Sequence, residues 1–286
     1  MQSKHGRHHF NFLSESFTLP REREDLREKM LSEPGSLWIV KPPGKNNGSG
    51  IYVINHPDEI PKTSGDETVL VQRYITNPYL IRRCKFDLRI YVLLTGLDPL
   101  KIYIYEEGLV RFAVNDFSLD PQKIKDNRIH VTNFDVNRKS DKFNFNNEDP
   151  TEPEGHKWTL TALWKYLSSE IKHGRNKNQV DLFTVWAKIE ELVIKSILCG
   201  LTSIKEELLP GRKKEMKSMY NFYKLFGYDI MLDSDRKPQL IEINARPAAL
   251  NDKETAIKII IYFYLPSLVR TLHVITVIPL GIFKRI

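Results

Sequence analysis

The stretch "FGYDIMLDSDRKPQLIEIN", residues 226–244, places two carboxylates and a carboxamide inside segments that otherwise resemble buried strands. A turn-forming run at 233–238 separates two apolar segments, which predicts an antiparallel hairpin. Side chains alternate between the two faces of a strand, so Glu242 and Asn244 share one face. A symmetric turn sets Asp229 directly opposite Glu242.

Two like charges that face each other destabilise a hairpin, and partly apolar surroundings increase the cost. Magnesium would neutralise them, because it takes oxygen ligands and commonly binds one or two carboxylates together with substrate phosphates. The predicted ligands are Asp229, Glu242 and Asn244, and Glu242 is placed to bridge two ions about 4 Å apart. A solvated edge hairpin without metal is the alternative.

The composition is that of a globular chain with a sizeable core. The 286 residues are 41% hydrophobic and 28% charged, and 43 Lys+Arg against 36 Asp+Glu give a net charge of +7. That balance favours an acidic partner: nucleic acid, anionic lipid, nucleotide or an acidic polypeptide. The two cysteines, Cys84 and Cys199, are far apart and indicate neither a disulfide framework nor a zinc site.

Upstream of the hairpin the pattern is dominated by strands. Residues 36–56 predict a strand, a glycine-rich flap and a second strand, and "ETVLVQRYI" ends in another strand. The flap, "PGKNNGSGI", is not a Walker A motif because a strand follows it, but such a loop can close over phosphates. A surface turn is the alternative. Two further strand signals follow, and we expect the second to be a hairpin around Glu107 and Gly108.

Within "KFDLR", three charged side chains share one strand face. Lys85, Asp87 and Arg89 alternate with Phe86 and two more apolar residues that point into the core. This row is either an exposed charge ladder or a phosphate- and ribose-binding face.

The second half of the chain carries two helical patterns. "GHKWTLTALWKYLSSEI" spaces Trp158, Ala162 and Tyr166 as in a helix, and a second helix follows Asp181 as its cap. Residues 251–286 are apolar, but charges and prolines interrupt them, which predicts a closing helix and an apolar tail. We expect no membrane anchor.

Several fragments, in this order, resemble the tubulin tyrosine ligase-like family, closest to its polyglutamylase branch. The resemblance covers roughly residues 10–250, and the fragments are "WIVKPP", "LVQRYI", "KFDLRIYV", "GLVRFA", "HVTN", "GHKW" and "LFGYDIMLD…KPQLIEIN". It implies an α+β, ATP-grasp-like fold of mostly antiparallel sheets with flanking helices and the nucleotide between two lobes. The ligase domain would span residues 1–250, with a central lobe at 1–75 and a C-terminal lobe at 76–250. The chain begins abruptly, so we expect further N-terminal family structure to be missing.

The resemblance implies an ATP- and Mg-dependent ligase that adds free glutamate to a glutamate side chain in an acidic tubulin tail, through an acyl phosphate. Two magnesium ions are expected. The implied partners are tubulin or microtubules, and the implied location is the cytoplasm and cytoskeleton, including cilium or basal body. We expect a monomer and no nucleic-acid partner.

The family's functional positions carry over residue by residue. The implied nucleotide-binding residues are Lys41, Gly48, Ser49, Gly50, Ile51, Gln72, Arg73, Tyr74, Ile75, Lys85, Asp87, Thr132 and Asn133. The implied catalytic residues are Arg89, near the γ-phosphate, and Arg111, at the acyl phosphate or the amino acid carboxylate. The implied amino acid site also contains Phe134, Lys157 and Lys258. The implied magnesium ligands are the three predicted from the hairpin.

Two departures from the family pattern keep alternatives open. Asn47 stands where the flap usually has a basic residue, and Ala248 stands where the loop after Asn244 usually has serine. One alternative is an inactive or truncated member that binds microtubules without catalysis. Another is a basic nucleic-acid binder, for which the chain shows no recognised fold signature.

Overall fold

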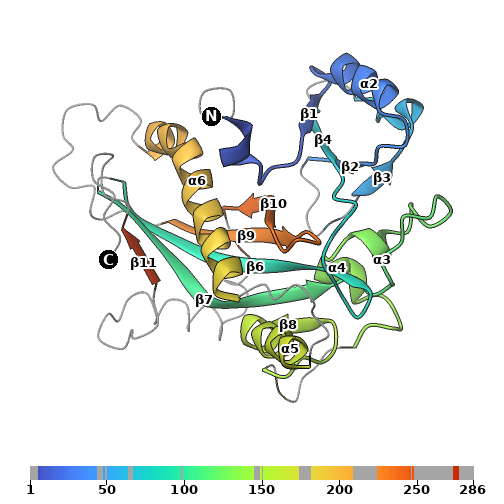
Figure 1. Cartoon of the computed structure of the whole chain (residues 1–286). Helices are drawn as coiled ribbons and strands as arrows, with labels where there is room; N and C mark the ends of the chain where they lie inside the picture. The colour runs from blue at the N-terminus through green and yellow to red at the C-terminus, as the bar shows by residue number, and fades with distance from the viewer. Residues whose placement is uncertain are drawn as a thin grey trace.

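The structure, a computed structural model, describes residues 6–43, 48, 50–63, 67–97, 99–144, 149, 151–173, 182–208, 224–245, 247 and 273–276. Within these ranges it is a mixed α/β molecule whose strand pairings are all antiparallel, as the sequence predicts. The strands form two sheets (Figure 1). Residues of both sheets line a cleft between them.

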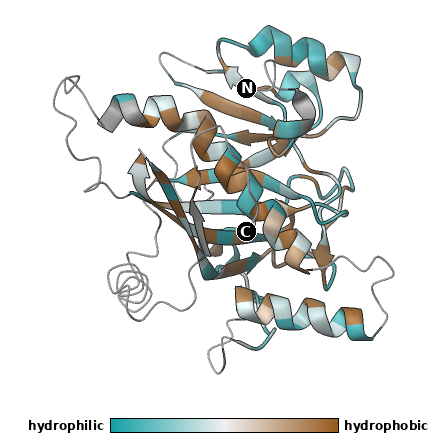
Figure 2. Cartoon of the chain, turned by 60° about the vertical axis from the view of Figure 1, so that its left-hand side comes forward, coloured by the Kyte–Doolittle hydropathy of each residue, from teal (hydrophilic) through white to brown (hydrophobic). Residues whose placement is uncertain are grey.

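The smaller sheet has four strands in the order β1-β4-β2-β3. Their bounds are β1 Ser16–Leu19, β2 Trp38–Lys41, β3 Tyr52–Ile54 and β4 Val69–Arg73. Helix α2, Arg23–Ser32, covers it and buries only Leu26 and Met30 into a small core around Trp38. Apart from the exposed Leu31, the rest of α2 is hydrophilic (Figure 2). The short 3-10 turn η2, Pro57–Glu59, lies beside α2, whereas η1, Arg7–Phe10, packs through Phe10 against the core of the larger sheet.

The larger sheet has seven strands, five of them in the order β10-β9-β6-β7-β11, with β5 paired to β6 and β8 paired to β7. Their bounds are β5 Leu80–Ile81, β6 Cys84–Leu97, β7 Leu100–Phe112, β8 Lys157–Thr159, β9 Lys224–Leu232, β10 Pro238–Asn244 and β11 His273–Thr276. Strand β11 lies within the range where we expect an apolar tail; the rest of 251–286 lies outside the described residues.

Helices α5, Leu160–Lys172, and α6, Leu182–Leu208, pack on one face of the larger sheet (Figure 1). That face takes Phe86, Leu88 and Ile90 from β6, so the predicted inward alternation of "KFDLR" is confirmed. The side chains on the opposite face of β6 line the cleft. Two short helices, α3 Asn127–His130 and α4 Phe134–Asn137, lie at the cleft's rim.

The expected hairpin around Glu107 and Gly108 is wrong. Strand β7 runs straight through both residues, and Gly108 pairs with Ile90 of β6. A Cβ at Gly108 would lie 2.4 Å from the Arg89 carbonyl oxygen. The glycine therefore permits close strand contact beside a bulge and makes no turn.

The first predicted helix begins later than its apolar spacing suggested. Trp158 lies in strand β8, and the helix starts only at Leu160. Trp158 is nevertheless buried in the same core, because β8 packs beside β7. Among the helices in the described part of the chain, none is long and apolar enough to cross a membrane.

Candidate active site

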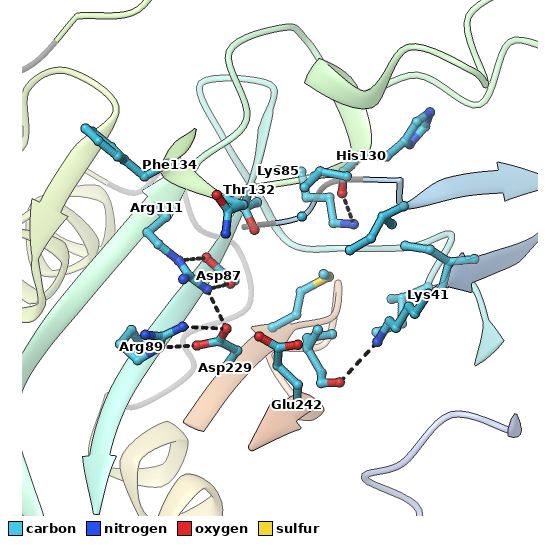
Figure 3. Close-up of a pocket in the computed structure, with 18 of the residues that line it drawn as sticks. Lys41, Lys85, Asp87, Arg89, Arg111, His130, Thr132, Phe134, Asp229 and Glu242 are labelled. Carbon is cyan, nitrogen blue, oxygen red and sulfur yellow. Dashed lines mark hydrogen bonds and ion pairs between the residues drawn. The ribbon is translucent and has the colours of Figure 1, made fainter. Parts of the chain in front are cut away.

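The cleft between the two sheets has a volume of about 1050 Å³ and is rich in charged side chains (Figure 3). Strands β2 and β4 form one wall, and β6, β7, β9 and β10 form the other. The rim is completed by α4 and by the segment that joins it to α3. The site is thus assembled from segments distant in the sequence.

Most of the residues predicted for the site line this cleft. They are Lys41, Gly48, Ile51, Gln72, Arg73, Tyr74, Ile75, Lys85, Asp87, Arg89, Arg111, Thr132, Asn133, Phe134, Lys157, Asp229, Glu242 and Asn244. Gly50 does not line it. Ser49 and Lys258 lie outside the described residues, as do Asn47 and Ala248.

Strand register aligns a row of buried charges across the larger sheet. Asp87 pairs with Arg111 of β7, and Arg89 pairs with Asp229 of β9. The side chains repeat this pairing: Arg111 Nε donates to Asp87 at 2.9 Å, and Arg89 Nη2 donates to Asp229 at 2.9 Å. Arg111 Nη2 also lies 2.9 Å from Asp229 Oδ2, the same oxygen that accepts from Arg89 Nη2. The "KFDLR" row is therefore a buried network and not an exposed ladder.

In the hairpin of β9 and β10, Asp229 lies opposite Glu242 as predicted, but the turn is not symmetric, because nearer to it Pro238 pairs with Leu232. A bulge between Leu240 and Glu242 aims the Glu242 side chain toward the cleft (Figure 3). The charge of Asp229 is neutralised by arginine, a partner that the sequence analysis did not foresee. Burial alone would raise the pKa of the Asp229 carboxyl, but Arg111 and Arg89 hold it below its usual range.

Among the described residues Glu242 forms no ion pair with a cation, and the nearby Lys41 charge opposes the rise of its pKa only in part. Burial and the Asp229 charge raise the pKa of the Glu242 carboxyl. Asn244 Nδ2 donates to Glu242 Oε1 at 3.1 Å, which orients the amide beside the two carboxylates. This donor set fits a hard cation such as magnesium, which favours carboxylate and amide oxygens. Nowhere in the described ranges, this hairpin included, do three or more His, Cys, Asp or Glu form a group that could hold a metal ion, so the set here consists of two carboxylates and one amide.

Two lysines face the cleft from opposite walls. Lys41 of β2 donates to Gln72 Oε1 at 2.8 Å and, across the cleft, to the Ile241 carbonyl at 3.1 Å. Lys85 is buried and donates to the His130 carbonyl at 2.7 Å. Burial lowers the pKa of both lysines, to about 7 for Lys85. Both amines lie where an anionic ligand would raise their pKa again.

At the rim, Phe134 lies between two cations. Lys157 Nζ is 5.9 Å from its ring centroid, and Arg138 lies 5.6 Å from it.

Deeper in the site, Gly227 makes room for Arg89, because a Cβ there would lie 3.1 Å from Arg89 Cδ and 2.9 Å from Pro247 Cβ. Arg89 can therefore lie across β9 and reach Asp229.

The geometry agrees with the sequence comparisons. The model of the tubulin-tyrosine ligase family matches residues 1–279. The chain belongs to this family. It is 40% identical to the tubulin monoglutamylase TTLL4 of Mus musculus over 248 residues, which are 87% of this chain and 19% of that protein. It is 37% identical to the tubulin polyglutamylase TTLL5 of Homo sapiens over 262 residues, 91% of this chain and 19% of that protein. The chain thus spans about a fifth of these relatives' length.

Within this ligase-family cleft, the structure adds His130 to the predicted residues. The fragment "HVTN" carries the resemblance, yet the sequence offered no partner that would single out its histidine. His130 is buried, and its Nδ1 lies 2.8 Å from the hydroxyl oxygen of Tyr74. Ile241 was also missed, because it contributes through its backbone carbonyl, which no side-chain pattern reveals.

Proposed function

We propose that this chain carries the catalytic domain of an ATP-dependent ligase that joins glutamate to a glutamate side chain of an acidic protein. The observation that carries the proposal is the register-aligned set of Asp87, Arg89, Arg111, Asp229 and Glu242 at the base of a cleft between two sheets. The family match and the names of the relatives support it.

The nucleotide would lie along the boundary between the sheets, which makes the smaller sheet a central lobe and the larger one a C-terminal lobe. The end of β4, at 72–75, offers an edge for adenine, and Thr132 and Asn133 close that side. Lys41 and Lys85 bring cations to the phosphates from opposite walls. Gly48 and Ile51 supply the described part of the covering flap. Both lysines are deeply set, so the phosphates would be bound away from bulk water.

Asp229, Glu242 and Asn244 would hold magnesium, which when bound would screen the charge between the β- and γ-phosphates. Arg89 and Arg111 are already desolvated and held by carboxylates, so little reorganisation is needed to meet the charge that develops. In the first step, the acceptor carboxylate oxygen bonds to the γ-phosphorus, and the bond to ADP breaks. In the second, the glutamate amine attacks the acyl carbon, loses a proton, and phosphate leaves.

The incoming amino acid would bind at the rim. Phe134 and Lys157 lie together there, and the ammonium of Lys157 suits a free carboxylate. The acceptor would be a tubulin tail, because the relatives are named tubulin mono- and polyglutamylases and this chain carries a net charge of +7. Action as a monomer at the microtubule cytoskeleton, including cilia, belongs to the same proposal.

The test is transfer of radiolabelled glutamate to tubulin with Mg-ATP. We expect incorporation by the wild type and a loss of at least about a hundredfold in Glu242→Gln, which keeps the shape but removes the charge. The matched control is Asp235→Asn, an exposed carboxylate in the turn of the same hairpin, which should retain full activity.

Two outcomes would contradict the proposal. If Glu242→Gln incorporated glutamate as fast as the wild type, Glu242 would have no role in catalysis or metal binding. Microtubule binding by a wild type that incorporates no glutamate would assign the chain to the non-catalytic members instead. Parallel reactions with glycine and tyrosine test the choice of amino acid.

A further inference from the structure

A buried cluster of Tyr74, Lys85 and His130 lies at the inner end of the cleft. It joins the end of β4, the start of β6 and the end of α3, which are separate segments of the chain. All three side chains are almost inaccessible, at 5%, 3% and 2% exposure respectively. The Tyr74 and His130 rings meet edge to face with centroids 5.3 Å apart.

Hydrogen-bond chemistry fixes the direction of every proton in this cluster. In its charged form, which an anionic ligand in the cleft favours, Lys85 can only donate, so the Tyr74 oxygen, 3.2 Å from Lys85 Nζ, must accept from it. The phenol's own proton then goes to His130 Nδ1, at 2.8 Å. Nδ1 must therefore be unprotonated, and His130 is the neutral tautomer with its proton on Nε2.

The surroundings agree with a neutral imidazole. Burial and the neighbouring Lys85 charge lower the pKa of His130 to about 4. In this tautomer the Nε2–H is buried and has no hydrogen-bond partner among the described residues, a cost that the bond from Tyr74 to Nδ1 must offset. The ring packs edge to face against Phe117, with centroids 6.2 Å apart, and in Figure 3 it points away from the cleft. His130 therefore contacts the cleft through its neighbours and not through its own ring.

Lys85 is held by two of these contacts. One N–H donates to the His130 carbonyl at 2.7 Å and a second donates to Tyr74, while the ammonium also lies 4.6 Å from the Tyr74 ring centroid. An ammonium has three N–H groups, so one remains for a ligand in the cleft. Without the bond from Tyr74 to His130, the phenol could rotate its proton toward Lys85 and lose the acceptor role.

We propose that His130 is a positioning residue for nucleotide binding, which acts through Tyr74 and through its own carbonyl to aim Lys85 at the phosphates of a nucleoside triphosphate. This inference rests on the proposed function only in assigning a nucleotide to the cleft. It predicts an effect on nucleotide affinity and none on the glutamate site at the rim.

The first experiment needs no ligand. Nitrogen-15 NMR of the histidine side chains should show His130 as the Nε2–H tautomer at neutral pH, and Tyr74→Phe should perturb that signal. An Nδ1–H tautomer or an imidazolium at His130 would overturn the inference whatever the chain catalyses.

The second experiment is a double-mutant cycle on the Kd of a non-hydrolysable ATP analogue with magnesium. His130→Ala and Tyr74→Phe should each weaken binding about fivefold, as expected for one lost hydrogen bond, and the double variant should be no weaker than either one. His130→Asn keeps a polar acceptor near the position of Nδ1 and should recover affinity to within about twofold. Arg128→Ala, an exposed change on the same helix, is the control.

The inference would be overturned if the losses of affinity in the two single variants multiplied in the double variant. It would also be overturned if His130→Asn had the unfolding midpoint of the wild type and recovered no affinity. Its failure is distinguishable from failure of the proposed function. A wild type that binds the nucleotide but transfers no glutamate overturns the ligase assignment and leaves the positioning role intact. A wild type that binds no nucleotide overturns both.

Discussion

At the scale of the residue, the site is a set of charges that burial makes costly and mutual pairing makes tolerable. Asp229 is 3% exposed and keeps its charge because two guanidinium groups contact it. Both arginines are themselves bound by carboxylates, so removing one partner would leave a buried charge unpaired. The sequence analysis identified the two facing carboxylates of the hairpin. From one strand pair, however, it could suggest magnesium as the neutralising group but not the arginines of other strands.

Lys85 should make the stability of the ligand-free protein depend on pH. Burial lowers its pKa from an ordinary 10.5 to about 7, with Asp87 opposing the shift. Between these two values the unfolded chain binds more protons than the folded one, so the free energy of unfolding should rise with pH across this window. Lys85→Met removes the effect. Between about pH 7 and about pH 9.5, the free energy of unfolding should therefore rise by about 3 kcal/mol more in the wild type than in the variant.

Urea unfolding of both proteins at the two pH values measures this gain. Lys123→Met, an exposed lysine, should follow the wild type. Parallel pH dependence in the wild type and Lys85→Met would show that Lys85 is not desolvated in the folded protein.

At the scale of the element, Glu107 of strand β7 shows how a side chain within one element can cap the start of another, helix α5. Glu107 Oε1 accepts from the backbone N–H of Leu160 at 2.7 Å, and Glu107 Oε2 accepts from the Thr161 hydroxyl at 2.6 Å. A carboxylate at the first turn of α5 caps the helix and complements its dipole. Glu107 and Gly108 looked like a turn because their tertiary roles, capping and close approach, use the same residue types as turns do.

Glu107→Ala should therefore destabilise the protein by about 1–2 kcal/mol, because two backbone donors of α5 and a hydroxyl lose their acceptor. The matched control is Glu152→Ala, which breaks the exposed ion pair with Lys165 of the same helix, 3.0 Å long, and should cost less than about 0.5 kcal/mol. Denaturant unfolding compares the two variants. Equal losses would mean that Glu107 acts as an ordinary surface charge.

At the scale of the whole molecule, the cleft depends on how the two sheets are joined. Lys41 bridges them directly, and Lys85 contacts the end of β4 from the larger sheet. A nucleotide between the sheets would contact both of these lysines. Ligand binding should therefore stabilise the whole molecule and not only one sheet.

A non-hydrolysable ATP analogue with magnesium, at about 100 times its Kd, should stabilise the wild type by about 2.7 kcal/mol and raise its Tm. Lys41→Met should lose most of this rise, because a phosphate contact and the bridge to Ile241 disappear together. Lys62→Met, an exposed change in the same part of the chain, is the control. A full Tm shift in Lys41→Met would place the phosphates elsewhere. Differential scanning fluorimetry gives all three values.

The sequence by itself determined the antiparallel strands, the opposition of Asp229 and Glu242, and the face shared by Lys85, Asp87 and Arg89. These follow from the two-residue period of a strand and from turn chemistry, which are local properties. The ordered fragments also indicated the family, and the resemblance to that family predicted most of the site residues that line the cleft.

Only the tertiary structure decided which charges neutralise one another. Arg111 of β7 contacts Asp229 of β9 across the intervening strand β6, and the His130 carbonyl accepts from Lys85, which lies 45 residues away in the sequence. Such contacts depend on register between distant strands and on backbone carbonyls, neither of which leaves a periodic trace in the sequence. The turn-like Glu107 and Gly108 belong here too, because the helix that Glu107 caps and the strand that Gly108 approaches are distant in the sequence.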